Sequence, residues 1–385
     1  MSFVIRGIGT ATPEHFIAQS DAAELAAKLS CQTAKQKNVL PVLYQQSGVK
    51  RRYSVLLEAS NNGRPAAQSF YQPLSEENRF GPNTSQRMQR YQTESVPLAV
   101  QASRAALHDS GLSSDKVTHL ITVSCTGFHA PGFDIALMRE LSLNAGVART
   151  HIGFMGCHGA LNALRVAQSF AKEDPTACVL LCAVELCSLH QQYGWNPQQI
   201  VANALFADGA AAVIGTSEQH ATAAQGVGRP MQHPAGWCLY DNGSTVIPES
   251  ESMMSWHIGD HGFEMSLSPL LPDLIRRRLG DWLNMWLGRH GMRRDDVSAW
   301  AIHPGGPRIL KAVAEAAGLD DLQLQASQTV LAEFGNMSSA TILFILQRLK
   351  QSHHAPLPCV ALGFGPGVTI EAALFVEAPH GCSTR

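Results

Sequence analysis

The sequence has few charged residues and lacks any long hydrophobic run. Charged residues make up 16% of the 385 residues and hydrophobic residues 45%, which is typical of a compact globular protein with a large core. The longest apolar runs, such as ACVLLCAV, are far shorter than the roughly 20 residues that span a bilayer. The N-terminus has no basic segment followed by an apolar core, so we expect neither a signal peptide nor a membrane span.

The sequence also lacks a basic face and a disulfide framework. Its net charge is −2 and its basic clusters are short and scattered, which excludes a nucleic-acid-binding surface. The nine cysteines are an odd number without a CxxC pair, which indicates reduced thiols and a cytoplasmic location. His257 and His261 are four residues apart, but no cysteine or carboxylate completes a ligand set, so we expect no metal site.

What the sequence does contain is an internal repeat. A helix that starts at Ser95 and is closed by Gly111 leads to the strand in SDKVTHLITVSCTG, and a helix closed by Gly291 leads to the strand in RDDVSAWAIHPGG. In each half a further helix and two apolar strands follow in the same order. This predicts an α/β protein with a duplicated core of layered sheets and helices, divided into halves 1–215 and 216–385. Residues 57–87 are rich in Asn, Gly, Pro and Ser and are predicted to form mostly loop.

Cys157 is the best candidate for a nucleophile. It opens the helix HGALNALRVAQSFAK in the segment GFMGCHGAL, where a helix N-terminus stabilises a thiolate. Glycines around it permit a tight turn and close approach of a substrate. A lone cysteine is more often apolar filler, and Cys178, Cys182 and Cys359 in apolar strands fit that role.

Asn336 and His303 are the candidate partners of this cysteine. Asn336 occupies the position in the second half that Cys157 occupies in the first, and His303 ends the strand before it. Taken singly, Asn336 is a helix N-cap and His303 a structural histidine at a strand end. In a duplicated fold the three side chains can converge on one central site, whereas His158 is not favoured as the partner.

Several motifs resemble those of type III polyketide synthases, the chalcone synthase-like condensing enzymes of the thiolase superfamily. They are HPGGPRIL, GNMSSAT, GFGPGVTIE, ALFADGAAAVI and GFMGCHGALNAL, the last being similar to the nucleophile segment of bacterial alkylpyrone synthases. The resemblance runs from about Val96 to Phe375 and implies a duplicated thiolase-like αβαβα fold, a homodimer, and CoA thioesters as substrates without a metal or redox cofactor.

The resemblance also implies roles for individual residues. Cys157 accepts the acyl group, and His303 and Asn336 stabilise the enolate formed when malonyl-CoA loses CO2. An imidazolium at His303 is expected to lower the pKa of the Cys157 thiol. The substrate-binding positions implied by the family are Phe206, Met265, His190, Ala130, Ser338, Gly363, Phe364, Gly365 and Pro366.

Departures from the family pattern concern the substrate. Met265 replaces a rigid aromatic residue, and Ala130 and His190 replace a methionine and a threonine of plant members. The segment before VKRRY lacks the family's basic CoA-contacting residues, so Lys50, Arg51 or Arg308 are the candidates for contacts with CoA phosphates. These departures favour a fatty acyl starter and an alkylpyrone or alkylresorcinol product over a chalcone-type product.

Three alternatives remain. A ketoacyl-ACP synthase III or HMG-CoA synthase-like enzyme shares the Cys–His–Asn set but lacks the GFGPG segment. A papain-type thioester hydrolase has no duplicated halves and carries its cysteine near the N-terminus beside a tryptophan. A non-catalytic dimeric scaffold would not need an intact Cys, His and Asn set.

Overall fold

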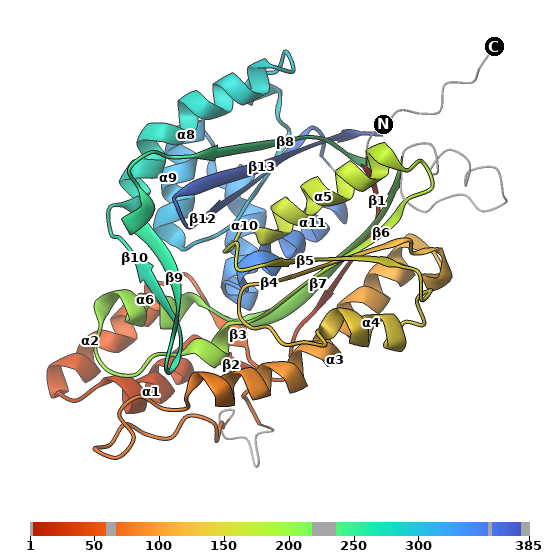
Figure 1. Ribbon diagram of the computed structural model, residues 1–385. Helices are drawn as coiled ribbons and strands as arrows, with labels where there is room; N and C mark the ends of the chain where they lie inside the picture. The colour runs from red at the N-terminus through yellow and green to blue at the C-terminus, as the bar shows by residue number, and fades with distance from the viewer. Residues whose placement is uncertain (1–2, 59–66, 218–235, 353–355, 379–385) are drawn as a thin grey trace, which may run out of the picture.

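A nine-stranded mixed sheet runs through the computed structural model, which describes residues 3–58, 67–217, 236–352 and 356–378 (Figure 1). The strand order is β11-β12-β13-β8-β1-β7-β6-β4-β5. The strands of this sheet are β1 (Phe3–Ala11), β4 (His119–Ser124), β5 (Ala148–Gly153), β6 (Cys178–Leu186), β7 (Asp208–Ser217), β8 (Trp237–Val246), β11 (Ala299–Ile302), β12 (Cys359–Gly365) and β13 (Thr369–Glu377). Two smaller sheets pair β2 (Phe16–Ala18) with β3 (Arg51–Tyr53) and β9 (Met254–Gly259) with β10 (Gly262–Leu267).

The two halves of the sheet have the same topology. β4 pairs parallel with β6, which pairs antiparallel with β7, and β7 pairs antiparallel with β1. In the other half β11 pairs parallel with β12, which pairs antiparallel with β13, and β13 pairs antiparallel with β8. Antiparallel pairing of β1 with β8 joins the halves. This symmetry confirms the duplicated α/β fold, while the boundary between residues 215 and 216 stays a prediction.

Helices cover both faces of each half-sheet. Figure 1 shows α5 and α11 between the half-sheets, α3 and α4 outside the N-terminal half, and α8 and α9 outside the C-terminal half, which gives αβαβα layers. The helices are α1 (Gln19–Ser30), α2 (Ala34–Gln45), α3 (Thr84–Ser110), α4 (Phe133–Glu140), α5 (Gly159–Glu173), α6 (Pro197–Leu205), α8 (Leu271–Gly288), α9 (Pro307–Ala317), α10 (Asp321–Phe334) and α11 (Thr341–Lys350).

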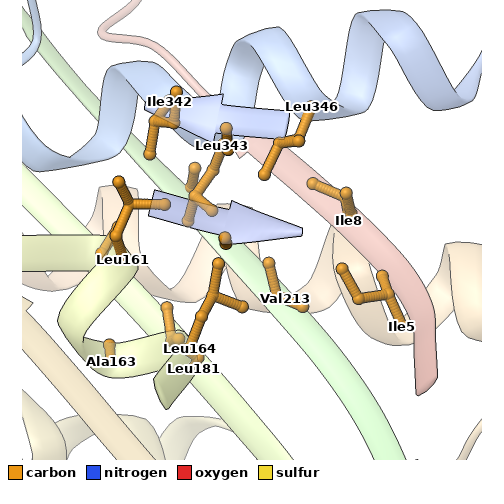
Figure 2. Packing of buried hydrophobic residues seen from close by; sticks show 14 of the residues in the cluster. Ile5, Ile8, Leu161, Ala163, Leu164, Leu181, Val213, Ile342, Leu343 and Leu346 are labelled. Carbon is orange, nitrogen blue, oxygen red and sulfur yellow. The ribbon is translucent and has the colours of Figure 1, made fainter. Parts of the chain in front are cut away.

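The central layer forms the core of the molecule. Leu161 and Leu164 of α5 and Leu343 of α11 are at most 1% exposed and pack on inward-facing strand residues (Figure 2). Alternate residues of β12 serve two clusters, since Ala361 faces this core and Leu362 faces α8 and α9. Strands buried on both faces explain the continuous apolar runs in the sequence.

Helix α3 begins eleven residues before the helix that we expected from residue 95. Asn83 accepts a hydrogen bond from the Gln86 N–H group, and the Gln86 side chain accepts one from the Asn83 N–H group. This capping box starts the helix inside a segment whose Asn, Pro and Ser content predicted a loop. The C-terminus was predicted correctly, because Gly111 adopts φ +67°.

Three predicted absences can be compared with the described part of the chain. None of its helices is both long and apolar enough to cross a membrane. Its eight cysteines are all free thiols, seven of them buried, and it contains no cluster of potential metal ligands. The ninth cysteine, Cys382, lies outside the described residues.

Two glycines of β1 allow α3 to lie directly on the sheet. A Cβ atom at Gly9 would lie 2.2 Å from the Ala106 N atom and 2.3 Å from the Ala102 O atom, and one at Gly7 would lie 2.4 Å from the Ala106 O atom. All of these neighbours are backbone atoms, which cannot move aside as a side chain can. The contact between α3 and β1 therefore requires glycine at these two positions.

We expect Gly9→Ala to lower the free energy of unfolding by about 3 kcal/mol, because α3 must shift away from β1. Urea unfolding followed by circular dichroism measures this. Gly288→Ala is the matched control, since a Cβ atom there meets nothing within 4 Å, and it should change stability by less than about 1 kcal/mol. Equal stability of the two variants would contradict this close-packing argument.

Candidate functional site

A cavity lies beside the turn that precedes α5. Of the predicted site residues it is lined by Cys157, Phe206, Met265, His190, Ser338 and Pro366. These side chains come from segments far apart in the sequence, including the η2 turn (Cys187–His190) and the η5 turn (Ser338–Ala340). The duplicated fold therefore brings most of the predicted pocket together.

Cys157 lies two residues before α5 and is 9% exposed. The chain reaches it through Gly156 at φ +88°, where a Cβ atom would lie 2.5 Å from Pro366 Cδ, so glycine is required. Burial raises the pKa of the Cys157 thiol to about 12, and the nearby Glu185 carboxylate adds to the rise. Hydrogen-bonding groups of Ser338 and Asn336 act in the opposite direction.

Asn336 is held beside the thiol by its own backbone. Its N–H group donates to the Leu205 carbonyl and its carbonyl accepts from the Ala207 N–H group, both at 2.9 Å. Its side-chain Oδ1 accepts a 2.9 Å hydrogen bond from the Ser338 N–H group. Because the amide oxygen is occupied, the Nδ2 hydrogens are the part of Asn336 that can donate to the thiol or to a ligand.

His303 directly follows β11, and its N–H group donates to the Leu362 carbonyl at 2.8 Å. The residue is 2% exposed, and both ring nitrogens lack a hydrogen-bond partner among the described residues. Burial, with a smaller effect of His158, lowers the pKa of His303 to about 3. The pKa shifts of Cys157 and His303 favour a neutral thiol and a neutral imidazole, in contrast to the ion pair expected from the sequence.

His158 has a structural role, as expected. Its Nδ1 lies 2.7 Å from Asn162 Oδ1 and its Nε2 lies 2.5 Å from Thr369 Oγ1. A Cβ atom at Gly365 would lie 2.2 Å from His158 Nε2, and one at Gly363 would lie 3.0 Å from His158 Cβ. The imidazole therefore fills the space that these two glycines leave.

Three other predicted pocket positions do not line the cavity. Gly363 and Gly365 pack against His158, and Phe364 is 3% exposed in the C-terminal core. From this loop only Pro366 is a lining residue. The lining differs from the prediction here because Gly363 and Gly365 face the His158 side chain, while Phe364 lies on the other face of β12 in the C-terminal core.

Ala130 is exposed and lines a different cavity, next to α4. The three predicted CoA-contacting cations do not line the main cavity either. Lys50 and Arg308 are exposed, and Arg51 donates to the Glu333 carbonyl. The cation that does line the cavity is Arg52, which sequence reasoning missed and which donates hydrogen bonds to the Asn203 and Phe206 carbonyls.

An aromatic wall, formed by His190, Trp256 and Phe263, closes one side of the cavity. The rings of His190 and Phe263 stack at 4.1 Å, and Trp256 lies edge-on to both. The Phe263 N–H group donates to His190 Nδ1, so His190 Nε2–H donates to the Thr126 carbonyl. Sequence reasoning missed Trp256 and Phe263, although Trp256 and Met265 occupy paired positions of one hairpin.

Glu185 is a further residue that sequence reasoning missed. It is fully buried at the end of β6 and accepts hydrogen bonds from the Cys125 N–H group and from the hydroxyls of Thr126 and Ser339. Burial raises the pKa of Glu185 to about 7 despite these bonds. Its position inside an apolar strand gave no signal that a carboxylate would lie near the nucleophile.

The chain matches known proteins over nearly its whole length. Residues 2–218 match the family model of chalcone and stilbene synthases, N-terminal domain, and residues 239–379 match that of the C-terminal domain. It is 31% identical to "Alpha-pyrone synthesis polyketide synthase-like Pks18" of Mycobacterium tuberculosis, over 97% of this chain and 90% of that protein. It is 33% identical to "1,3,6,8-tetrahydroxynaphthalene synthase" of Streptomyces peucetius, over 96% of this chain and 92% of that protein.

A solved structure agrees with these matches. PKS-I from the brown alga Ectocarpus siliculosus superposes with a TM-score of 0.87 at 29% identity, covering 98% of both chains.

We expect Glu185 to make stability depend on pH. Its folded-state pKa is raised from 4.5 to about 7, so the folded protein keeps a proton that the unfolded chain releases, and stability falls as pH rises through this interval. Glu185→Gln should not lose stability in this way. The free energy of unfolding of the variant minus that of wild type should therefore rise by about 3 kcal/mol from pH 4.5 to about pH 8. Urea unfolding across this range measures it. A pH-independent difference between the two proteins would contradict the raised pKa.

Proposed function

The chain belongs to the chalcone and stilbene synthase family of type III polyketide synthases, which are acyltransferases, and we propose that Cys157 carries the acyl chain in this reaction. The observation that carries the proposal is the contact of Cys157 with Ser338 and Asn336, where Cys157 and Ser338 line the cavity and Asn336 is buried behind them. His303 does not line the cavity either; it is buried close to His158, and both of its ring nitrogens lack a partner among the described residues. Buried polar atoms without partners favour a ligand that completes their hydrogen bonds.

Loading of the starter begins with the thiol proton. Because the imidazole of His303 is neutral, it can accept that proton as the Cys157 sulfur attacks the acyl-CoA carbonyl. The tetrahedral oxyanion accepts hydrogen bonds from the Asn336 amide, and the departing CoA thiolate takes the proton back from His303. A thioester is exchanged for a thioester, so the step has little net free-energy change.

Extension of the chain uses the same groups. Malonyl-CoA loses CO2, and its enolate oxygen accepts hydrogen bonds from His303 and Asn336. The enolate carbon attacks the acyl group on Cys157, the Cys157 thiolate leaves, and the chain on CoA is two carbons longer. No electron is transferred to an external acceptor, so this chemistry uses the CoA thioesters and no further cofactor.

The products that we propose are pyrones, resorcinols or related rings made from a fatty acyl starter. The names of the two relatives, which refer to an alpha-pyrone and to tetrahydroxynaphthalene, support a cyclised polyketide. Ile17, Leu25, Leu29, Leu56 and Leu57 in the cavity lining support an aliphatic starter. The exposed Lys50 and Arg308 and the partly buried Arg51 remain the candidates for contacts with CoA phosphates.

We further propose a cytoplasmic homodimer. β5 is the outer strand of its half-sheet, so its free edge can pair with another strand. Phe128 and Phe154 are 54% and 37% exposed, and both rings contact Phe263 of the aromatic wall. A second copy that covers these rings would bury an apolar patch beside the cavity.

Incubation with acyl-CoA starters and radiolabelled malonyl-CoA tests the reaction. Wild type should give cyclic polyketides, Cys157→Ala should give none, and Asn336→Ala should lower kcat about 100-fold or more through loss of an oxyanion donor. Cys182→Ala is the control, because this buried thiol lies outside the cavity lining and should leave the product pattern unchanged. Elongation by Cys157→Ala would overturn the assignment of the nucleophile.

The same assay separates the alternatives. A β-ketoacyl product of a single condensation indicates a ketoacyl synthase III-like reaction, and free acid alone indicates a hydrolase.

Light scattering during gel filtration tests the dimer. Wild type should elute with twice the chain mass of 41.5 kDa, and Phe128→Asp should shift the equilibrium towards the monomer. Leu322→Asp is the control, since Leu322 is 76% exposed on α10, and it should remain dimeric. A monomeric wild type would contradict the proposal.

A further inference from the structure

One face of α1 lines the cavity that contains Cys157. Ala22, Leu25, Ala26 and Leu29 are spaced three and four residues apart and form a stripe along that face. The surface that we call the α1 wall consists of this stripe together with Ile17, Leu56 and Leu57. All seven side chains are aliphatic, and Leu25 alone among them is partly exposed.

The aromatic wall lines the same cavity as the α1 wall. Phe263 is 1% exposed and stacks on His190, and both ring nitrogens of His190 are engaged in hydrogen bonds. The Trp256 Nε1–H group donates to the Cys125 carbonyl at 2.8 Å. Because each ring is fixed by a stacked neighbour or a hydrogen bond, we do not expect these side chains to move aside for the alkyl chain of a substrate.

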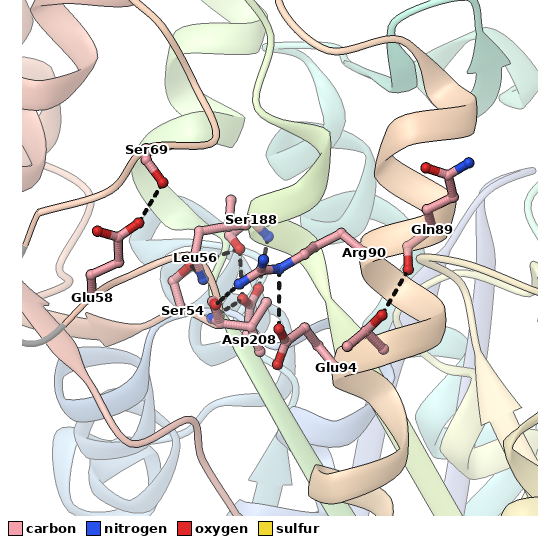
Figure 3. A network of polar contacts seen from close by, with 11 residues as sticks. Ser54, Leu56, Glu58, Ser69, Gln89, Arg90, Glu94, Ser188 and Asp208 are labelled. Atoms are coloured by element: carbon pink, nitrogen blue, oxygen red, sulfur yellow. Dashed lines mark hydrogen bonds and ion pairs between the residues drawn. The ribbon is translucent and has the colours of Figure 1, made fainter.

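Hydrogen bonds anchor the part of the α1 wall that carries Leu56 and Leu57. The Val55 N–H group donates to Asp208 Oδ2 at 2.9 Å, and the Ser188 N–H group donates to Asp208 Oδ1 at 2.7 Å (Figure 3). The Ser54 hydroxyl accepts a hydrogen bond from the Leu56 N–H group, which fixes the next residues of the wall. The buried Asp208 carboxylate therefore keeps the segment with Leu56 and Leu57 at the cavity.

Two of the polar side chains near the α1 wall are already engaged. Arg52 donates to the Asn203 and Phe206 carbonyls, and the Asn203 amide exchanges hydrogen bonds with the Gln192 backbone. These side chains therefore offer few hydrogen bonds to a polar substrate. On the remaining apolar surface, each methylene group that a ligand buries should increase its binding affinity about fourfold.

We propose that the alkyl tail of an aliphatic starter lies along the α1 wall, and that Ala22 and Ala26 set the chain length which the enzyme accepts. This inference rests on the proposed function, in which the tail belongs to an acyl group on Cys157. The two alanines are decisive because their small side chains leave open the space that a larger residue would fill.

A chain-length profile tests the proposal. kcat/KM is measured for a starter series from acetyl-CoA to stearoyl-CoA. Ala26→Phe should lower kcat/KM for long starters at least about tenfold and leave acetyl-CoA within about twofold. Leu25→Ala should shift the starter length with the highest kcat/KM towards longer chains. This second variant keeps the proposal testable if Ala26→Phe folds poorly. Glu24→Phe is the matched control on the exposed face of α1 and should keep the wild-type profile.

A binding measurement separates this inference from the proposed function. In the Cys157→Ala background, calorimetry compares decanoyl-CoA with free coenzyme A. Ala26→Phe should weaken decanoyl-CoA binding at least about tenfold and leave coenzyme A unchanged, even if the enzyme yields no cyclic product. Equal losses for both ligands would assign the α1 wall to the CoA moiety and overturn the proposal, as would unchanged binding of both.

Discussion

A short antiparallel pairing between β1 and β8 holds the two halves of the molecule together as one sheet. Phe3, Val4 and Ile5 are registered against residues 237–239 of β8, and these are the only strand pairs between the halves in the described structure. α5 and α11 lie between the half-sheets that this junction aligns. The segment before one helix supplies Cys157 and the segment before the other supplies Asn336, so both halves contribute to the site. There the Asn336 backbone also joins the halves through hydrogen bonds with Leu205 and Ala207.

Sequence reasoning succeeded where the information is local or repeated. The strand and helix order, Cys157 at a helix start and Asn336 at the equivalent start could all be predicted because the same pattern occurs twice. It failed where a side chain is defined by a distant partner. Glu185 lies in an apolar run, and the local sequence does not indicate its hydrogen bond with Ser339. Trp256 lies on a hairpin, and tertiary packing determines which face of that hairpin lines the cavity.

The electrostatics of the site explain why the pattern alone was misleading about charge. A helix start was expected to favour a thiolate at Cys157, but burial of the thiol outweighs that partial charge and raises its pKa. The same burial holds His303 neutral. In the reaction that we propose, a site without preformed ions carries charge only while the substrate is reacting, when the oxyanion and the enolate accept hydrogen bonds from Asn336.

The imidazole of His158, which packs against Gly363 and Gly365 of β12, couples two segments that are about two hundred residues apart in the chain. No side chain fits at Gly365 while a histidine occupies position 158, since even a methyl group would lie within 2.2 Å of the ring. Substitutions at the two positions are therefore not independent. Across related sequences, a residue larger than glycine at 365 is compatible with this packing only alongside a smaller residue at 158, so the two positions should vary as a pair.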